Sequence, residues 1–380
     1  MTTPRSSSPP PLRSSGERLR GDPDPWLGGA SVLAAGPGSA RVLRRGERSV
    51  VVERRPLVVC LLLAAVAAGV VVGSLVLGEI QVGLPRVWAT LTGHGTAIED
   101  LLVLDLRLPR VLTALLVGAA LGMAGAIFQN ISRNPLGSPD VIGFDYGSAT
   151  GALVVMLFLD GSGLQTAAGA VVGGMATAAL VYVLALRNGL DGLRLVLVGI
   201  GVGFALISVN QYLIVRSNLY DAQSAAVWLV GNLAGRGWDH VRLLAPALLV
   251  LVPLALLLAR PLRMAELSDQ TAVALGLRTE RVRLAAVVVG VLLASVAVAT
   301  AGPIAFIALT APQIARRLTR VTGPNLVASG LTGAILLGIS DWCARELFAP
   351  RPVPVGVLTG VVGGLYLAWL LTREWRKGVA

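Results

Sequence analysis

Residues 132–155, SRNPLGSPDVIGFDYGSATGALVV, interrupt one of the most apolar parts of the chain. The stretch places two prolines, four glycines, two aspartates, an arginine and an asparagine between hydrophobic blocks. Pro135 lacks a backbone donor and disfavours helix at Asn134, so we expect a helix to end there. Residues 137–140, Gly-Ser-Pro-Asp, offer capping side chains and a proline suited to the first turn of a new helix. The pattern predicts two helices that meet at a break.

The helix expected after the break is rich in glycine. Gly143, Gly147 and Gly151 predict a thin and loosely determined helix. One interpretation is a gate beside an interior pathway; the other is a re-entrant turn with a structural role. The residues that would form the gate are Asn134, Pro135, Gly137, Pro139, Gly143 and Gly147. The sequence alone leaves both interpretations open.

The composition indicates an all-α membrane protein. Of the 380 residues, 54% are hydrophobic and 14% are charged, and the mean hydropathy is +0.74. A soluble domain carries about a quarter charged residues. Apolar blocks such as LLLAAVAAGVVVGSLVL (61–77) and LLAPALLVLVPLALLLA (243–259) approach the roughly 20 residues that span a bilayer core. The net charge of +11 is explained by arginines that mark one side of the membrane, so no nucleic-acid partner is expected.

Hydropathy predicts about ten transmembrane helices. The expected spans are 56–77, 108–130, 144–160, 164–186, 195–215, 241–259, 284–301, 303–318, 326–346 and 353–372. With the N-terminus inside, the cytoplasmic ends hold 20 basic residues and the outer ends hold 8. This bias predicts a multi-pass protein of the cytoplasmic membrane with both termini in the cytoplasm. The third and eighth spans are the shortest.

The first 55 residues differ from the rest. They are rich in Ser, Pro, Gly and Arg, and they cannot bury enough apolar surface to order themselves. We expect residues 1–55 to be a disordered cytoplasmic tail without a signal peptide, and residues 56–380 to form a transmembrane domain.

An arginine-rich cytoplasmic loop, RPLRMAELSDQTAVALGLRTERVR (260–283), has helix-capping signals. Ser268 is a good N-cap and Gly276 a good residue after the C-cap, which predicts a helix of about two turns between them. Thr279 is expected to cap the next helix, with Glu280 in its first turn. Such a helical knob suits docking of a soluble partner, although an ordinary capped loop explains the same residues.

Three of the arginines expected on the outer side, against the charge bias, are candidates for a functional role. Arg107 and Arg110 are three residues apart and are expected on one helix face, and Arg345 lies near the outer end of the ninth span. Carboxylates of an external protein could pair with them. Local pairing with Asp105 or Glu346, or snorkelling, is the alternative.

The sequence lacks the residues that ATP hydrolysis and metal binding require. A phosphate-binding loop of the Walker A type needs a lysine, and the only lysine is Lys377. We therefore expect no ATP hydrolysis by this chain itself, and no cofactor. His94 and His240 are the only histidines and lie far apart, so no metal site is predicted. A proton- or sodium-driven transporter needs ionisable residues within its spans, and Asp341 is the nearest candidate.

Four segments, in this order, resemble one family. They are RLPRVLTALLVGAALGMAGAIFQNISRNPLGSPDVIGFDYGSATGA (107–152), AELSDQTAVALGLRTERVR (265–283), AGPIAFIALTAPQIARRL (301–318) and PVPVGVLTGVVGGLYLAWLL (352–371). They resemble the membrane permeases of ABC importers for iron–siderophore complexes, haem and vitamin B12. Within that family the chain is most similar to ferric enterobactin permease subunits, through RNPLGSPDVIGF and GPIAFIALTAPQIARRL.

The resemblance implies a type II ABC importer permease fold with ten spans. It implies a pathway between two permease chains, with a heterodimer favoured and a homodimer possible, two copies of a separate ATPase subunit, and an extracytoplasmic siderophore-binding lipoprotein. The cargo would be a ferric siderophore of catecholate type, with vitamin B12 or haem as the alternative.

The resemblance also assigns roles to residues. Coupling helices at about 264–283 would contact the ATPase through Leu267, Ser268, Ala272, Leu275, Gly276 and Leu277. Arg107, Arg110 and Arg345 would receive carboxylates of the binding protein.

Overall fold

The computed structural model describes residues 32–34, 40–45, 48–78, 80–161, 163–186, 192–266, 269–321 and 323–378. The chain divides into two compact units, Met1–Arg54 and Arg55–Ala380. This division lies one residue from the boundary expected from composition.

The first unit contains a small antiparallel sheet. Its strands are β1 (Val32–Ala34), β2 (Ala40–Arg45) and β3 (Arg48–Glu53), in the order β1-β2-β3. The register pairs Val42 with Val51 and Arg45 with Arg48, which leaves only two residues between β2 and β3. These residues therefore differ from the disordered tail that composition predicts. The physical reason is local: RSVVVE contains three consecutive valines, which favour strands, and the register of β2 and β3 suits a hairpin.

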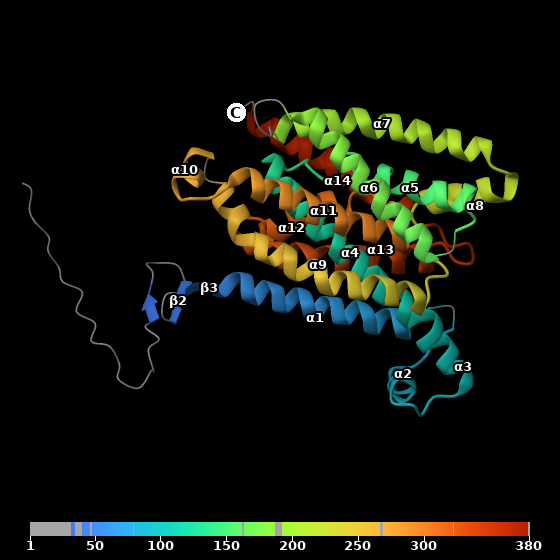
Figure 1. Ribbon diagram of the computed structural model, residues 1–380. Coiled ribbons are helices and arrows are strands. Elements are labelled where there is room, and N and C mark those ends of the chain that lie inside the picture. The colour runs from blue at the N-terminus through green and yellow to red at the C-terminus, as the bar shows by residue number, and fades with distance from the viewer. Residues whose placement is uncertain are drawn as a thin grey trace, which may run out of the picture. The chain divides into compact units, whose positions relative to one another are not determined.

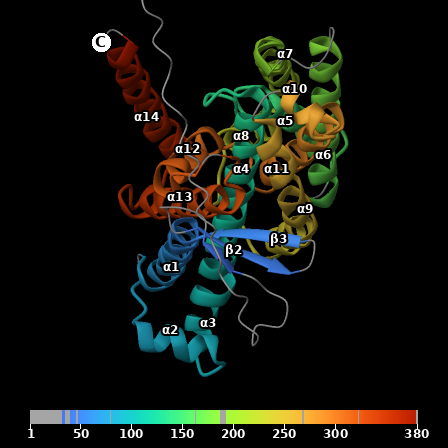
Figure 2. The same cartoon turned by 90° about the vertical axis from the view of Figure 1, so that its left-hand side faces the viewer.

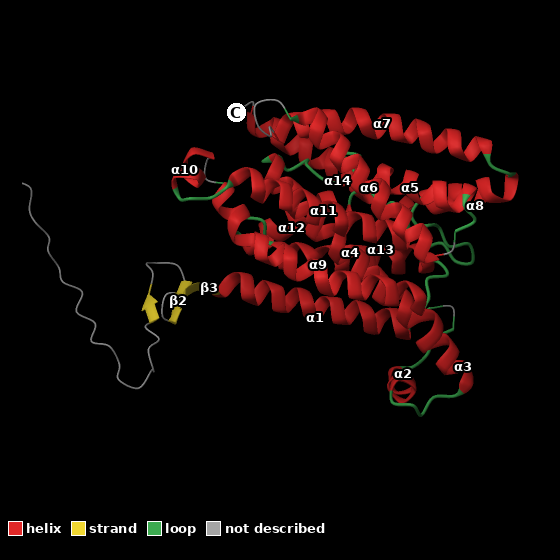
Figure 3. Cartoon of the chain, in the orientation of Figure 1, coloured by secondary structure: helices red, strands yellow, loops and turns green. Residues whose placement is uncertain are grey.

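Every element described after Glu53 is a helix (Figure 3). In chain order these are α1 (Arg54–Val76), α2 (Leu84–Leu91), α3 (Ala97–Asp100), the π-helical segment η1 (Leu101–Arg107), α4 (Leu108–Ser132), α5 (Phe144–Phe158), α6 (Gly163–Ala185), α7 (Gly192–Arg216), α8 (Leu219–Leu229), α9 (Trp238–Ala265), α10 (Asp269–Ala274), α11 (Thr279–Ala301), α12 (Ile307–Thr319), α13 (Leu326–Glu346) and α14 (Val355–Gly378). The long helices of the second unit run lengthwise between two ends (Figure 1). We call these the α10 end and the α2 end.

Each of the ten expected spans coincides with one of these helices, which confirms the all-α membrane fold. Among the described residues, seven helical stretches are long and apolar enough to cross a membrane, with Ala97–Ser132 counted as one stretch. Three expected spans are not among the seven: the apolar part of α14 is Val355–Trp369, α5 has 15 residues and α12 has 13. The last two are the shortest. At 1.5 Å per residue they measure only about 22 Å and about 20 Å, short of the roughly 30 Å hydrocarbon core.

Helix α4 forms the centre of the second unit and is buried along most of its length (Figure 2). It packs directly against α13 and α12 through glycines. A Cβ on Gly118 would lie 2.3 Å from the carbonyl oxygen of Gly333, and one on Gly125 would lie 1.8 Å from that of Ala308. Only glycine allows these backbones to approach so closely, as small residues do in membrane helix pairs.

Helices α5 and α6 also pack backbone to backbone. A Cβ on Gly147 would lie 2.0 Å from Oγ1 of Thr177, and one on Gly151 would lie 2.0 Å from the carbonyl oxygen of Gly169. The glycines that predict a loosely determined helix instead hold α5 tightly against its neighbour. That prediction failed because the sequence does not reveal which backbone faces the glycines.

The break after α4 is a re-entrant segment, residues 133–143. It follows the first turns of α7: Ser132 lies against Gly192, Ile142 against Gly199, and Gly143 against Gly203. From Gly192 to Gly203, α7 rises by about 16 Å. The segment therefore carries the chain from the α10 end back toward the middle of the unit, where α5 begins.

Candidate functional site

The first candidate site is a hollow between the beginnings of the two short helices. It measures about 330 Å³, and its walls include Asp140, Tyr146, Ile200, Gly203, Phe204 and Phe306. Phe204 is 67% exposed, so the hollow opens at the surface of the chain. In a membrane protein this surface would meet either lipid or another protein chain.

The side chain of Asp140 joins the two helix beginnings. Its Oδ2 accepts a hydrogen bond of 3.0 Å from the backbone N–H of Phe306, which precedes the first residue of α12. Phe306 has φ = 69°, and Gly143, at the start of α5, has φ = 90°. Irregular backbone at membrane depth requires such internal partners. Two helix N-termini converge here, and their partial positive charges favour an anion.

The structure holds the six candidate gate residues in one segment with many contacts. Oδ1 of Asn134 accepts from the N–H of Leu136 (2.9 Å), and the Pro135 carbonyl accepts from Nε2 of Gln313 (2.9 Å). The Pro139 carbonyl accepts from the N–H of Phe144 at 3.0 Å. The remaining three, Gly137, Gly143 and Gly147, fit against Ser132, Gly203 and Thr177. The geometry is that of a re-entrant turn.

Sequence reasoning missed Asp145, which lies in the first turn of α5. Its side chain is 2% exposed, and neither carboxylate oxygen has a hydrogen-bond partner among the described residues. A buried carboxylate without a partner is costly unless it is neutral. The expected spans therefore contain two buried aspartates, Asp145 and Asp341, among the described residues. The signal was available, because Asp145 stands inside an apolar segment that was predicted as a span.

The second candidate site is the knob at α10. Gly276 has φ = 80°, its N–H donates to the Val273 carbonyl (2.9 Å), and the Leu277 N–H donates to the Ala272 carbonyl (2.9 Å). This pair of bonds defines a Schellman ending and confirms the predicted place of Gly276. Ala272 is buried, whereas Leu275 is 59% exposed and faces away from the chain. An exposed leucine on a charged loop suits contact with a partner.

Other predictions for this loop fare differently. Leu267 and Ser268 lie outside the described residues. Thr279 does not cap α11 with its side chain: it is the first helical residue, and Arg278 precedes it without a side-chain cap. Glu280 lies in the first turn, as predicted.

Polar contacts link the start of this knob to the centre of the unit. Glu266, three residues before α10, accepts a hydrogen bond from Asn130 of α4. Arg133 donates to the Ala265 carbonyl at 2.8 Å. From α12, Arg316 donates to the side chain of Gln129. The end of α9 is therefore tied to α4, and α4 to α12.

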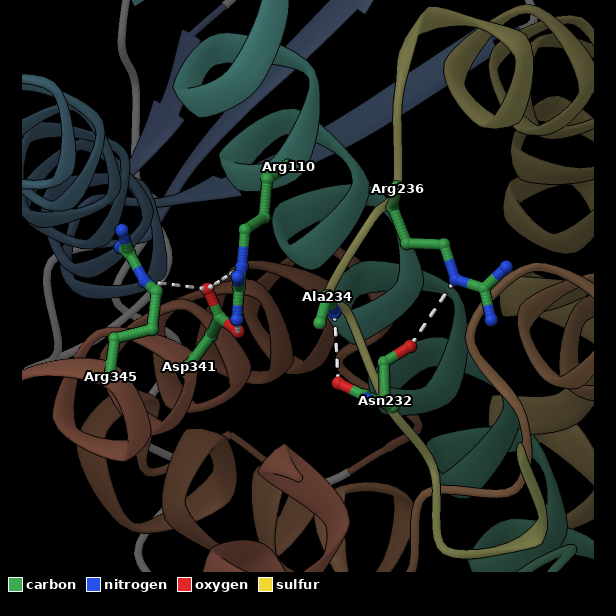
Figure 4. A network of polar contacts seen from close by, with 6 residues as sticks. All are labelled: Arg110, Asn232, Ala234, Arg236, Asp341 and Arg345. Carbon is green, nitrogen blue, oxygen red and sulfur yellow. Dashed lines mark hydrogen bonds and ion pairs between the residues drawn. The ribbon is translucent and has the colours of Figure 1, made fainter. Parts of the chain in front are cut away.

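The third candidate site is the set of arginines at the α2 end. Arg110 donates from Nε and Nη2 to both carboxylate oxygens of Asp341, and Nε of Arg345 lies 3.4 Å from Oδ2 of the same carboxylate (Figure 4). Arg107 instead donates to the backbone carbonyls of Leu75 and Ile80. Local pairing thus exists, with Asp341 rather than with Asp105 or Glu346. Arg107 and Arg110 do not share a partner, although they are three residues apart.

No cluster of three or more His, Cys, Asp or Glu side chains suited to a metal occurs in the part of the chain that the structure describes. The features above define a polytopic membrane protein with the architecture of a transport permease: broken helices around a hollow, a knob at one end and an arginine cluster at the other.

Comparisons with known proteins give the same class. The FecCD transport family matches residues 61–373. The ferric enterobactin transport system permease protein FepG of Escherichia coli (strain K12) is 44% identical over 86% of this chain and 99% of its own length. The Fe(3+)-citrate import system permease protein YfmE of Bacillus subtilis (strain 168) is 38% identical over 86% of this chain and 98% of its own length.

A solved structure agrees. A protein described as a metal-chelate type ABC transporter, in an inward-facing conformation, aligns with a TM-score of 0.75 and 26% identity over 83% of this chain and 99% of that chain. This chain therefore belongs to the FecCD transport family and is a membrane permease of the ABC importer type.

Proposed function

We propose that this chain is the permease subunit of an ATP-driven importer that carries a ferric siderophore, of catecholate type, across the cytoplasmic membrane. The observation that carries the proposal is the 44% identity to a ferric enterobactin permease protein over 86% of the chain. The α10 end is cytoplasmic in this proposal, because the basic residues concentrate there. Both termini then lie in the cytoplasm.

The hollow beside Asp140 supports a role in the pathway. Polar groups such as the Asp140 carboxylate and the Tyr146 hydroxyl are costly against lipid. A second permease chain, different in sequence or identical, would cover this face and enclose the hollow between the two chains. The helix N-termini around it would favour an anionic chelate over a cationic one. The segment 134–147 would move when the pathway changes sides.

The knob supports contact with a separate ATPase subunit. Two such subunits, one for each permease chain, would receive Ala272, Leu275, Gly276 and Leu277, together with Leu267 and Ser268. Motion of α10 would pass through Glu266 and Asn130 to α4, since these residues are hydrogen-bonded. This route transfers movement between packed helices without requiring an active site in the permease.

The arginine cluster supports docking of an extracytoplasmic siderophore-binding lipoprotein. Arg110 and Arg345 share one aspartate, Asp341, so these three side chains together carry a net charge of +1. Carboxylates of the binding protein would be attracted to it. Arg107 would contribute to the same field.

The proposal is tested by uptake of labelled ferric siderophores into iron-limited cells with and without this chain. The panel holds catecholate, hydroxamate and citrate chelates, haem and vitamin B12. Loss of catecholate uptake alone is expected, and loss of another cargo instead would replace the substrate. Uptake that stops with a protonophore while ATP stays high would contradict ATP coupling.

A further inference from the structure

A further cavity of the second unit lies outside all three candidate sites, at the α2 end. It measures about 680 Å³. Its walls come from the ends of α5 and α11, from the start of α6, from α8, and from the start of α9. Trp238 begins α9 and donates from Nε1 to the Leu104 carbonyl at 2.9 Å. Tryptophan at the end of a membrane helix is typical of the membrane–water interface, so the cavity lies at headgroup depth.

Arg236 on the cavity wall is a cation without a counter-ion among the residues that the structure describes. Its Nε donates to the Asn232 carbonyl (3.3 Å), and its Nη1 donates to Nε2 of His240 (2.8 Å). Among the described residues, Nη2 has no hydrogen-bond partner and no carboxylate lies within ion-pair distance of this guanidinium. Figure 4 shows the Arg236 side chain apart from Asp341 and pointing away from it.

The surroundings make this lack of a partner costly. Burial lowers the pKa of the Arg236 guanidinium, and no carboxylate opposes that effect. The nearest acid in the sequence, Asp239, lies 3.8 Å from Arg242 instead. A half-buried charge without an anion is unfavourable, and a charge-assisted contact to an anion would offset the cost.

The rest of the cavity favours an anion that carries an apolar chain. Met156, Leu164, Trp228, Leu243 and Ala299 line most of it together with two glycines, and the polar side chains on its wall besides Arg236 are Thr166, Asp239, His240, Arg242 and Thr300. Leu164 is 73% exposed, so the cavity opens at a surface that lipid can reach. A small free anion has no apolar surface to bury against these walls, so they would not strengthen its binding.

We propose that this cavity binds a phospholipid, with its headgroup phosphate on Arg236 and an acyl chain along the apolar wall. The phosphate is positioned by the Nη2 edge of the guanidinium, while His240 and Asn232 fix the other two nitrogens. The site is independent of the cargo and of the docking arginines.

The test uses the full-length chain, purified with the subunits that accompany it, and dioctanoyl phosphatidylglycerol as the probe, with bound lipid counted by native mass spectrometry. Arg236→Gln is expected to weaken one lipid site by about tenfold or more, since a hydrogen bond to a charged group contributes about 1.5–3 kcal/mol. Leu164→Trp, which fills the cavity from an exposed position, is expected to abolish the same site. Arg216→Gln, at an exposed arginine near the same end, should change nothing.

Three further outcomes would overturn the proposal. Unchanged lipid binding in both cavity variants would remove the site. Displacement of the lipid by inorganic phosphate at equal concentration would make it a free-anion site. Equally tight binding of dioctanoylglycerol, which lacks the phosphate, would leave Arg236 without the assigned role.

Discussion

Two guanidinium nitrogens of Arg110, in α4, donate hydrogen bonds of 2.8 to 3.2 Å to the carboxylate of Asp341, in α13. The two residues are 231 positions apart in the sequence. Asp341 is 3% exposed, so this is a buried ion pair and Arg345 adds a second positive charge beside it. The pair fixes the C-terminal part of α13 against the central helix. Breaking it by removing one partner leaves a charge uncompensated.

Asp341→Asn is therefore expected to destabilise the chain by about 3–5 kcal/mol, because Arg110 and Arg345 lose their shared carboxylate. The matched control is Asp145→Asn, at an equally buried aspartate whose oxygens have no partner among the described residues. That variant should melt at the same temperature as the parent or higher. Thermal unfolding in one detergent measures both, and equal losses in the two variants would contradict the difference in pairing.

The sequence predicts the helices well because hydropathy and helix-ending residues act locally. Pro135 and Gly276 mark real helix ends for this reason. The partners of Arg110 and the role of Gly147 could not be predicted, since each depends on a helix distant in the sequence. Asp145 shows the opposite case: its position inside an apolar segment was visible, but its isolation becomes evident only when its neighbours are known.

Arg345→Gln tests the docking role without unpairing Asp341, which keeps its three hydrogen bonds from Arg110. The affinity for the binding protein is expected to fall by about tenfold at low salt and by less at high salt, because screening weakens charge attraction. Surface binding measurements at two ionic strengths give the comparison. Arg86→Gln, at an exposed arginine of the same end that pairs with Glu99 at 3.6 Å, is the control. A salt-independent affinity in the parent would argue against electrostatic docking.

Gly276→Val tests the knob. With φ = 80°, this position strains a β-branched residue by about 1–3 kcal/mol, so the Schellman ending should open and the exposed Leu275 should shift. Uptake is expected to fall severalfold while ATP hydrolysis by the assembled transporter continues. Gly276→Asn, which tolerates this conformation, should retain most uptake. If the valine variant transports normally, the knob does not couple hydrolysis to movement.

Glu266 gives a pH prediction. Burial raises the pKa of this carboxyl above 4.5, against the opposing effects of Asn130 and of Arg316, Arg263 and Arg133. The folded chain then binds more protons than the unfolded chain, so this group stabilises the fold below pH 4.5 and that contribution is lost as the pH rises through the folded pKa. As the pH is raised from about 4 to about 7, the melting temperature of Glu266→Gln should therefore fall less steeply than that of the parent. Asn130→Ala should move the fall to higher pH, and an unchanged profile in both variants would contradict the assignment.

Gly125 tests the packing of the centre. A Cβ there would lie 1.8 Å from the Ala308 oxygen and 2.6 Å from its carbonyl carbon, both backbone atoms that cannot rotate away. Gly125→Ala should therefore push α12 from α4 and destabilise the chain by about 1–3 kcal/mol. Gly69→Ala, in α1 with nothing within 4 Å of the added carbon, should be neutral or stabilise by up to about 1 kcal/mol. Thermal unfolding of the two variants in parallel measures this difference, and a Gly125→Ala chain that melts with the parent would mean that the two backbones are not in contact.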